Sequence, residues 1–379
     1  MAQFLSNERF GNSSDGAYSP STGTDAPIDS ACTGTINTTS LLATNGSFAA
    51  GQLILIHQTR GAGAGQWELN KISSYIAGTI TTKYKLTYGY ISGAQVLVMP
   101  QYASGNIAGG VTLTGKAWNG TVGGIYAKFG NGTFTVPGSL VGSGIGFRGG
   151  VGGNRDQPVA GQSGESDLGI GQQVSGDNTN SATNGPGGQG GHGQSGGGTA
   201  LGGGGGGHTN AGSHVDVSIA GGTASSDTAN LTIMLFGGGG GGGGAAPGED
   251  NPKDYGQLGG NSGGMILIIA KTIIITGSMP TAGLSGANSA HPSFEEGGGG
   301  GGSGGSILLK GQTIILGSNL VTSLYGNGGA GSKSYQSGGN GSVGRIHADY
   351  STSISGTTNP SIDSTQDRTL ADSFQGGMI

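Results

Sequence analysis

Runs of nearly pure glycine are the feature that most restricts what this chain can fold into. They occupy residues 202–207, 237–244 and 297–302, and 90 of the 379 residues are glycine, about one in four where about 7% is usual. A glycine run has no side chains to bury, and ordering it costs more backbone entropy than ordering any other residue. Such a run is therefore either a flexible linker or a segment whose backbone does the packing.

The context of the runs favours packing. They contain almost no other residue, they recur in step with a strand repeat, and apolar residues adjoin them, such as 231–236 before the run at 237. Glycine can form polyproline-II-type helices with three residues per turn. Without Cβ atoms these helices can lie backbone to backbone and exchange N–H···O=C bonds. We therefore expect packed polyglycine II helices in place of a side-chain core.

A repeat separates the runs. Residues 263–278 and 304–318 both read Gly-Gly followed by two apolar stretches, residues 344–350 begin a third copy, and residues 123–139 hold a more distant one. Each copy predicts two short strands rich in Ile and Val. A unit of this size cannot bury its apolar face alone, so stacked copies are expected. The repeat predicts a β-solenoid-like body.

The first part of the chain differs from the rest. It is the zone poorest in glycine, and it contains strand-like stretches at 53–57, 66–72, 79–88 and 96–99, with alternating or β-branched residues. Residues 50–58 and 93–101 match each other, which predicts paired strands of a small barrel or sandwich. The expected division of this all-β chain is an N-terminal β attachment domain (1–107), a glycine-rich repeat body with exposed loops (108–350) and an extended C-terminal tail (351–379).

Composition excludes several classes of partner. Fifteen Lys and Arg without a basic cluster cannot neutralise the phosphates of a nucleic acid. No apolar run approaches the roughly 20 residues that span a bilayer, so membrane insertion is not expected, and the N-terminus does not read as a secretory signal. Cys32 is the single cysteine, which leaves no internal disulfide and no CxxC site.

No cofactor or metal site is expected. GxGxxG patterns arise by chance in a chain this rich in glycine, and none lies between a strand and a helix. The spacing of His192, His208, His214 and Asp216 matches no recurring metal pattern. The acidic stretch 249–254 is the best calcium candidate, but it lies in a loop where solvated carboxylates are the simpler interpretation.

Hydrolysis of a polysaccharide would need paired carboxylates, and the sequence offers three pairs. They are Glu165 with Asp167, Glu249 with Asp250, and Glu295 with Glu296. All lie in loop-like sequence, where sequence spacing does not give the separation across a groove that glycoside hydrolysis requires. The chain is therefore expected not to be an enzyme.

Loops that interrupt the glycine carry a stronger functional signal. They concentrate charge, proline and aromatic residues, and loops on a rigid scaffold are where recognition usually resides. The alternative is that they are solubilising tips. The candidate receptor-binding residues are Arg155, Asp156, Asp250, Lys253, Tyr255, His291, Phe294, Lys333 and Tyr335.

The glycine run 237–244 followed by 263–277, together with 55–61, 67–72 and 146–150, resembles a family of glycine-rich proteins of phages and uncultured bacteria. The alternation of glycine runs with variable loops also resembles the general sequence pattern of tail-fibre adhesins of some T-even-type phages. That likeness implies a sandwich of glycine helices whose tip loops bind a host receptor. No residue roles transfer, because no motif aligns.

The favoured interpretation is a non-enzymatic virion structural protein, a phage tail fibre, spike or tail-tip adhesin. Its expected partners are a host envelope receptor (a glycan or an outer-surface protein) and other tail or fibre proteins, in a homo-oligomer that is a trimer by analogy with fibres. A bacterial cell-surface or extracellular filament protein is the alternative. A polysaccharide-degrading spike and an ice-binding protein are less favoured, the latter because the Thr residues cluster in the N-terminal zone.

Overall fold

The computed structural model describes residues 10–154, 160–173, 184–191, 200–215, 219–245, 255–289, 296–332 and 337–371. This part of the chain is all-β, with one short 3-10 helix and large parallel sheets. The elements are β1 (Ala17–Tyr18), β2 (Gly23–Asp25), β3 (Asp29–Gly34), β4 (Ser40–Ala43), β5 (Leu53–Gln58), β6 (Trp67–Ile76), β7 (Thr79–Thr82), β8 (Tyr90–Val98), β9 (Gln101–Tyr102), β10 (Ser104–Asn106), β11 (Thr112–Gly115), β12 (Ile125–Val136), β13 (Ser139–Val141), β14 (Met265–Ile275), β15 (Met279–Pro280), β16 (Ser306–Thr322), β17 (Arg345–Asn359), β18 (Asp363–Gln366) and η1 (Arg368–Leu370).

The N-terminal part contains a closed antiparallel barrel with strand order β3-β4-β7-β6-β5-β8. The two matching stretches of the sequence pair as predicted, since β5 lies antiparallel to β8 with Ile56 opposite Val96. The barrel interior is apolar, and Ile54, Ile56 and Val96 are fully buried in it. Of the two predicted arrangements, the chain therefore adopts the barrel and not the sandwich.

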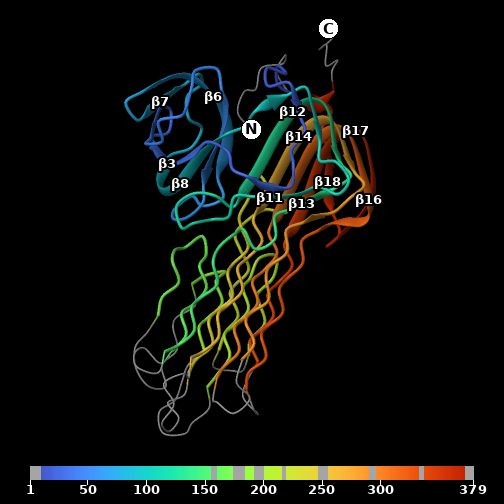
Figure 1. Cartoon of the computed structure of the whole chain (residues 1–379). Coiled ribbons are helices and arrows are strands. Elements are labelled where there is room, and N and C mark those ends of the chain that lie inside the picture. The colour runs from blue at the N-terminus through green and yellow to red at the C-terminus, as the bar shows by residue number, and fades with distance from the viewer. Residues whose placement is uncertain are drawn as a thin grey trace.

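The repeat forms a parallel sheet in which β12, β14, β16 and β17 lie side by side in that order (Figure 1). Equivalent residues of the copies face one another: Ile273 pairs with Phe134 on one side and with Ile314 on the other. The prediction of two short strands per copy is wrong, because each copy forms one continuous strand. Register shifts, for example between Gly311 and Thr313, let a strand change direction while its ladder continues.

Two apolar cores flank this sheet because side chains alternate along each strand. Ile266 and Ile268 face one core with Leu113 and Leu140. Met265, Leu267 and Ile269 face a second core that includes barrel residues. Full burial of one such side chain stabilises the fold by about 1.5–3 kcal/mol. The barrel thus covers one face of the sheet.

The ends of the chain also enter the sheets. β1 and β2 pair with β10 and β11, and β17 and β18 continue the large sheet to residue 366. The closed barrel itself lies between residues 29 and 98. The division into domains at 1–107, 108–350 and 351–379 stays a prediction.

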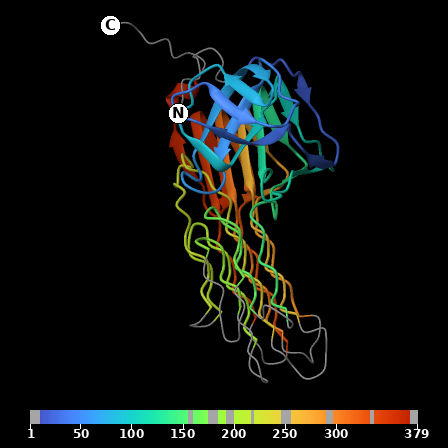
Figure 2. The same cartoon turned by 90° about the vertical axis from the view of Figure 1, so that its left-hand side faces the viewer.

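The glycine runs belong to neither helix nor strand, and they extend away from the strands as a bundle of side-by-side segments (Figures 1 and 2). We call the described non-strand segments between residues 142 and 344 the glycine body. Along residues 238–244, donation to the same neighbouring segment recurs every third residue. Gly238, Gly241 and Gly244 donate to the carbonyls of Gly207, Gly204 and Leu201, while Gly240 and Gly243 donate to those of Gly260 and Gln257.

The close approach of these segments explains why glycine is required. A Cβ on Gly203 would lie 2.0 Å from the carbonyl oxygen of Gly241, and one on Gly300 would lie 2.1 Å from that of Gly204. The backbone donors and acceptors therefore bond each other across the space that side chains would otherwise fill.

Candidate functional site

The predicted receptor-binding residues lie almost entirely outside the described residues. These are Arg155, Asp156, Asp250, Lys253, His291, Phe294, Lys333 and Tyr335. Tyr255 is described: its side chain is 48% exposed, and its backbone forms an isolated antiparallel bridge with Asn154. An exposed Tyr at this point suits contact with a partner, because its ring is large and its hydroxyl is polar.

Residues that flank three of these loop segments meet at Glu296, which is 2% exposed. One carboxylate oxygen, Oε2, accepts hydrogen bonds from Ser289 Oγ (2.7 Å) and Gln257 Nε2 (2.9 Å). The backbone N–H of Glu296 donates to Ser332 Oγ at 2.9 Å, and Ala245 bridges to Glu296. Together with the pair Asn154 and Tyr255, these residues border 155–159, 246–254, 290–295 and 333–336.

The glycine segments that end at these residues run to the end of the glycine body farthest from the large sheet (Figures 1 and 2). The opposite end of the run 237–244 adjoins Phe236, which packs against Trp118 and Phe147 beside the barrel. The fold therefore brings together the chain positions from which the predicted loops depart, and it holds them at one end.

Two carboxylates of the candidate catalytic pairs, Glu165 and Glu296, have structural partners. Glu165 is 3% exposed and pairs with Arg60 Nη1 (2.7 Å) and Arg148 Nε (3.0 Å). Asp167 is also buried; its Oδ1 has no hydrogen-bond partner in the described part of the chain, and burial raises the pKa of this carboxyl. Glu249, Asp250 and Glu295 lie outside the described residues.

Of the three histidines of the candidate metal site, the structure describes His208 and His214, and His214 is exposed. His192 and Asp216 lie outside the described residues. His208 is fully buried, with Nε2 2.8 Å from Asp227 Oδ2 and Nδ1 2.7 Å from the carbonyl oxygen of Gly304. Among the described residues, no group of three or more His, Cys, Asp or Glu side chains is placed to hold a metal ion.

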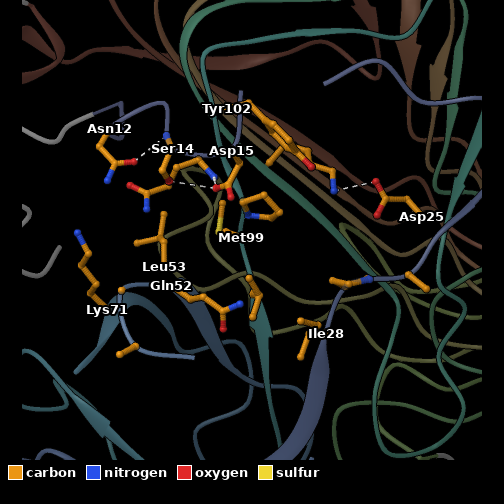
Figure 3. A pocket seen from close by; sticks show the side chains of 18 residues that line it. Asn12, Ser14, Asp15, Asp25, Ile28, Gln52, Leu53, Lys71, Met99 and Tyr102 are labelled. Carbon is orange, nitrogen blue, oxygen red and sulfur yellow. Dashed lines mark hydrogen bonds and ion pairs between the residues drawn. The ribbon is translucent and has the colours of Figure 1, made fainter. Parts of the chain in front are cut away.

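A cavity of about 640 Å³ lies between the barrel and the large sheet (Figure 3), and we call it the barrel–sheet cavity. Its walls come from the segment before β3, the start of β5, the link from β8 to β9, and β12. Residues that matter for its chemistry are Asn12, Asp15, Asp25, Gln52, Tyr102 and Lys128. Its volume is in the range of about 300–1,000 Å³ that is common for ligand sites.

A buried ion pair lies in the wall of this cavity. Lys128 Nζ is 2.7 Å from Asp25 Oδ2, and it lies 4.9 Å and 5.0 Å from the ring centroids of Tyr18 and Tyr126. Burial lowers the pKa of Lys128, and Asp25 opposes that shift. Burial, with Asp25 and Asp15 nearby, raises the pKa of Tyr102 to about 12, so its hydroxyl stays neutral and can donate a hydrogen bond.

Sequence reasoning missed this cavity. Its lining residues lie between positions 12 and 128 and carry no shared motif or spacing. The matching strands at 50–58 and 93–101 indicated the barrel, but nothing in them indicated where the barrel would leave a gap against β12.

Comparison with known proteins does not assign this chain to a family. No protein-family model matches the chain, and no curated protein matches it. Among solved structures, the Gp54 tailspike of Acinetobacter baumannii bacteriophage AP22, in complex with A. baumannii capsular saccharide, aligns with a TM-score of 0.19 and 9% identity, over 91% of this chain and 58% of that chain. This TM-score is too low to indicate a shared fold.

No helix within the described residues is both long enough and apolar enough to span a membrane.

Proposed function

We propose that this chain is a non-enzymatic phage tail fibre, spike or tail-tip adhesin, and that the loops at the far end of its glycine body recognise the host cell surface. The observation that carries this proposal is the convergence on Glu296 of residues bordering three loop segments, with a fourth segment bordered by the Asn154–Tyr255 bridge. Segments that are distant in sequence can thereby form one contact surface, with the barrel left at the other end for attachment. The residues proposed for contact are Arg155, Asp156, Asp250, Lys253, Tyr255, His291, Phe294, Lys333 and Tyr335.

The glycine body is proposed to consist of polyglycine II helices, and the stacked strands to form a short solenoid. Two observations support the helices. Backbone hydrogen bonds recur every third residue along residues 238–244, which matches a helix with three residues per turn, and successive residues of that run donate to different neighbouring segments. The in-register parallel ladder supports the solenoid. A stiff support of this kind would hold tip loops in one geometry and so reduce the entropy cost of binding.

The proposed partners are a host envelope receptor, either a glycan or an outer-surface protein, and other tail or fibre proteins. The proposed location is the virion, in a homo-oligomer that is a trimer by analogy with fibres. Immunogold labelling of purified particles tests the location: label on the tail or fibre is expected. Label on the cell envelope with bare particles would overturn the viral proposal in favour of a bacterial surface protein.

Loop replacement tests recognition. Residues 246–254 and 290–295 are replaced by Gly/Ser segments of equal length, leaving Tyr255 and Glu296 in place. Saturable binding of the purified chain to host cells is expected to fall by about tenfold or more, as loss of a binding hot spot produces. The matched control is Ile76→Ser, a residue 71% exposed on the barrel, which should leave cell binding unchanged. Equal binding by the loop-replaced chain and the control would contradict the proposal.

A further inference from the structure

We propose that the barrel–sheet cavity is a second binding site, and that its ligand is a short neutral saccharide. It lies beside the barrel, and none of its lining residues borders the loop segments. The inference therefore does not depend on the function proposed for those loops.

The charges around the cavity select against an ionic ligand. Two ammonium groups, Lys71 and Lys128, and two carboxylates, Asp15 and Asp25, line it. Lys128 and Asp25 neutralise each other at 2.7 Å, and Asp25 also accepts a hydrogen bond from the Tyr18 hydroxyl. Because Asp25 neutralises Lys128 and Asp15 is itself a carboxylate, a phosphate or a polyanion gains no net attraction from these three side chains.

The polar groups that remain available are those that bind sugar hydroxyls. Asn12 Oδ1 accepts from the Ser14 N–H at 3.0 Å, and Gln52 Oε1 accepts from the Ala49 N–H at 2.8 Å. The amide NH₂ groups of both side chains have no partner within the described residues, and neither has the Tyr102 hydroxyl. In Figure 3 these three side chains lie around the cavity. They offer donors and acceptors that a ring carrying several hydroxyls can match.

The apolar part of the lining suits the faces of sugar rings. Pro27 and Ile28, both half-buried, belong to the lining, so the cavity combines some apolar surface with a few fixed polar groups, as small-molecule sites do. The half-buried ring of Tyr102 packs on Tyr18 with centroids 4.7 Å apart, which fixes its orientation.

An added peptide strand fits less well, because the backbone around the cavity is already paired. The Asp15 N–H donates to the Gln101 carbonyl (3.1 Å), and the Gln101 N–H donates to Asp15 Oδ2 (2.6 Å). The Met99 N–H donates to the Leu53 carbonyl at 2.9 Å. Strand addition needs a free edge, so recognition here depends on side chains.

Screening of the full chain on an array of neutral bacterial and algal oligosaccharides, followed by calorimetry with the best-binding sugar, tests the proposal. Tyr102→Phe removes one hydroxyl, and Asn12→Ala removes one amide side chain, including the Oδ1 that accepts from the Ser14 N–H. Each is expected to weaken binding by about threefold to tenfold, which is the effect of losing one neutral hydrogen bond. Ser353→Ala, at an exposed position on β17, is the matched control and should bind like the parent chain.

The chain with residues 246–254 and 290–295 replaced separates this site from the loops. It should keep the full affinity for the sugar even if it no longer binds host cells. The proposal is overturned if no oligosaccharide binds, or if Tyr102→Phe and Asn12→Ala bind as tightly as the parent. It is also overturned if sugar binding depends on the replaced loops, or if the cavity variants fail only to assemble with tail proteins, which would indicate a protein ligand.

Discussion

Gly241 shows at the scale of one residue why the glycine body tolerates no other side chain. Its N–H donates to the Gly204 carbonyl at 2.9 Å, and a Cβ added to it would lie 2.0 Å from the Gln189 carbonyl oxygen. We predict that Gly241→Ala lowers the free energy of unfolding by about 3 kcal/mol or more, since the clashing atoms are backbone. Urea denaturation measures the loss.

Gly109→Ala is the matched control for Gly241→Ala. An added Cβ at Gly109 has no heavy atom within 4 Å, so the free energy of unfolding should change by less than about 0.5 kcal/mol. Similar effects for the two substitutions would mean that the glycine segments are not packed as closely as the structure has them.

Asp167 gives a prediction about pH. Burial raises the pKa of its carboxyl above the usual 3.8, so the folded state holds this proton more tightly than the unfolded state. Its contribution to stability is therefore greatest below pH 3.8 and is lost as pH rises through the folded pKa. We predict that Asp167→Asn raises the melting temperature at pH 8 and has little effect at pH 3.5. An equal shift at both pH values, measured by calorimetry, would show that ionisation is not the cause.

At the scale of elements, the parallel ladder gives a matched pair of neighbouring residues. Ile314 of β16 is fully buried between Ile273 and the next strand, whereas Ile315 is 41% exposed. We predict that Ile314→Ala lowers the free energy of unfolding by about 2–5 kcal/mol and that Ile315→Ala lowers it by less than about 1 kcal/mol. Denaturation curves of the two variants measure both losses of unfolding free energy. Equal losses would place the strand in a different register.

The strands were predictable from sequence because their signals are local. The match between 50–58 and 93–101 predicted the pairing of β5 with β8, and the repeat predicted the stacking of β14, β16 and β17. The neighbours of each glycine run were not predictable, since identical residues carry no pairing information. The positions near Glu296 at which the loop segments begin and end depend on that packing, so the sequence could not predict them either.

Contacts between segments distant in the sequence could not be predicted either. Asp227 pairs with His208 and with Arg345 Nε at 2.8 Å, although Arg345 follows it by more than 100 positions. The barrel–sheet cavity has the same origin, because it exists only where β12 and the barrel meet. Periodicity reports which side of an element is buried, but not which element covers it.

At the scale of the whole molecule, the segment 228–236 of the glycine body holds it against the barrel. The Trp67 indole N–H donates to the Leu231 carbonyl (3.1 Å), His57 Nε2 lies 2.8 Å from the Met234 carbonyl, and the Met234 N–H donates to the Gly65 carbonyl (2.9 Å). The ion pair of Arg60 with Glu165 adds a second connection. Barrel and glycine body should therefore unfold together.

His57 makes this joint sensitive to acid. Burial lowers its pKa from 6.5 to about 4, and its hydrogen bond to the Met234 carbonyl only partly opposes that shift. Between pH 6.5 and pH 4 the unfolded chain takes up a proton that the folded chain refuses, so stability falls as pH is lowered across this window. From that pKa difference we predict a loss of about 3 kcal/mol, and His57→Gln should flatten the slope of unfolding free energy against pH.

Fluorescence of Trp67 and Trp118, both of which contact the segment 228–236, reports on the joint, while far-UV circular dichroism reports on the strands. Because the joint contributes to both the barrel and the glycine body, the two signals should change at the same pH during acid titration in a fixed urea concentration. A fluorescence change that precedes the dichroism change would instead show that the barrel separates from the glycine body before either unfolds. In that event an adhesin built on this chain would hold its loops on a hinged support. The entropy cost of binding would then not be reduced by a rigid support.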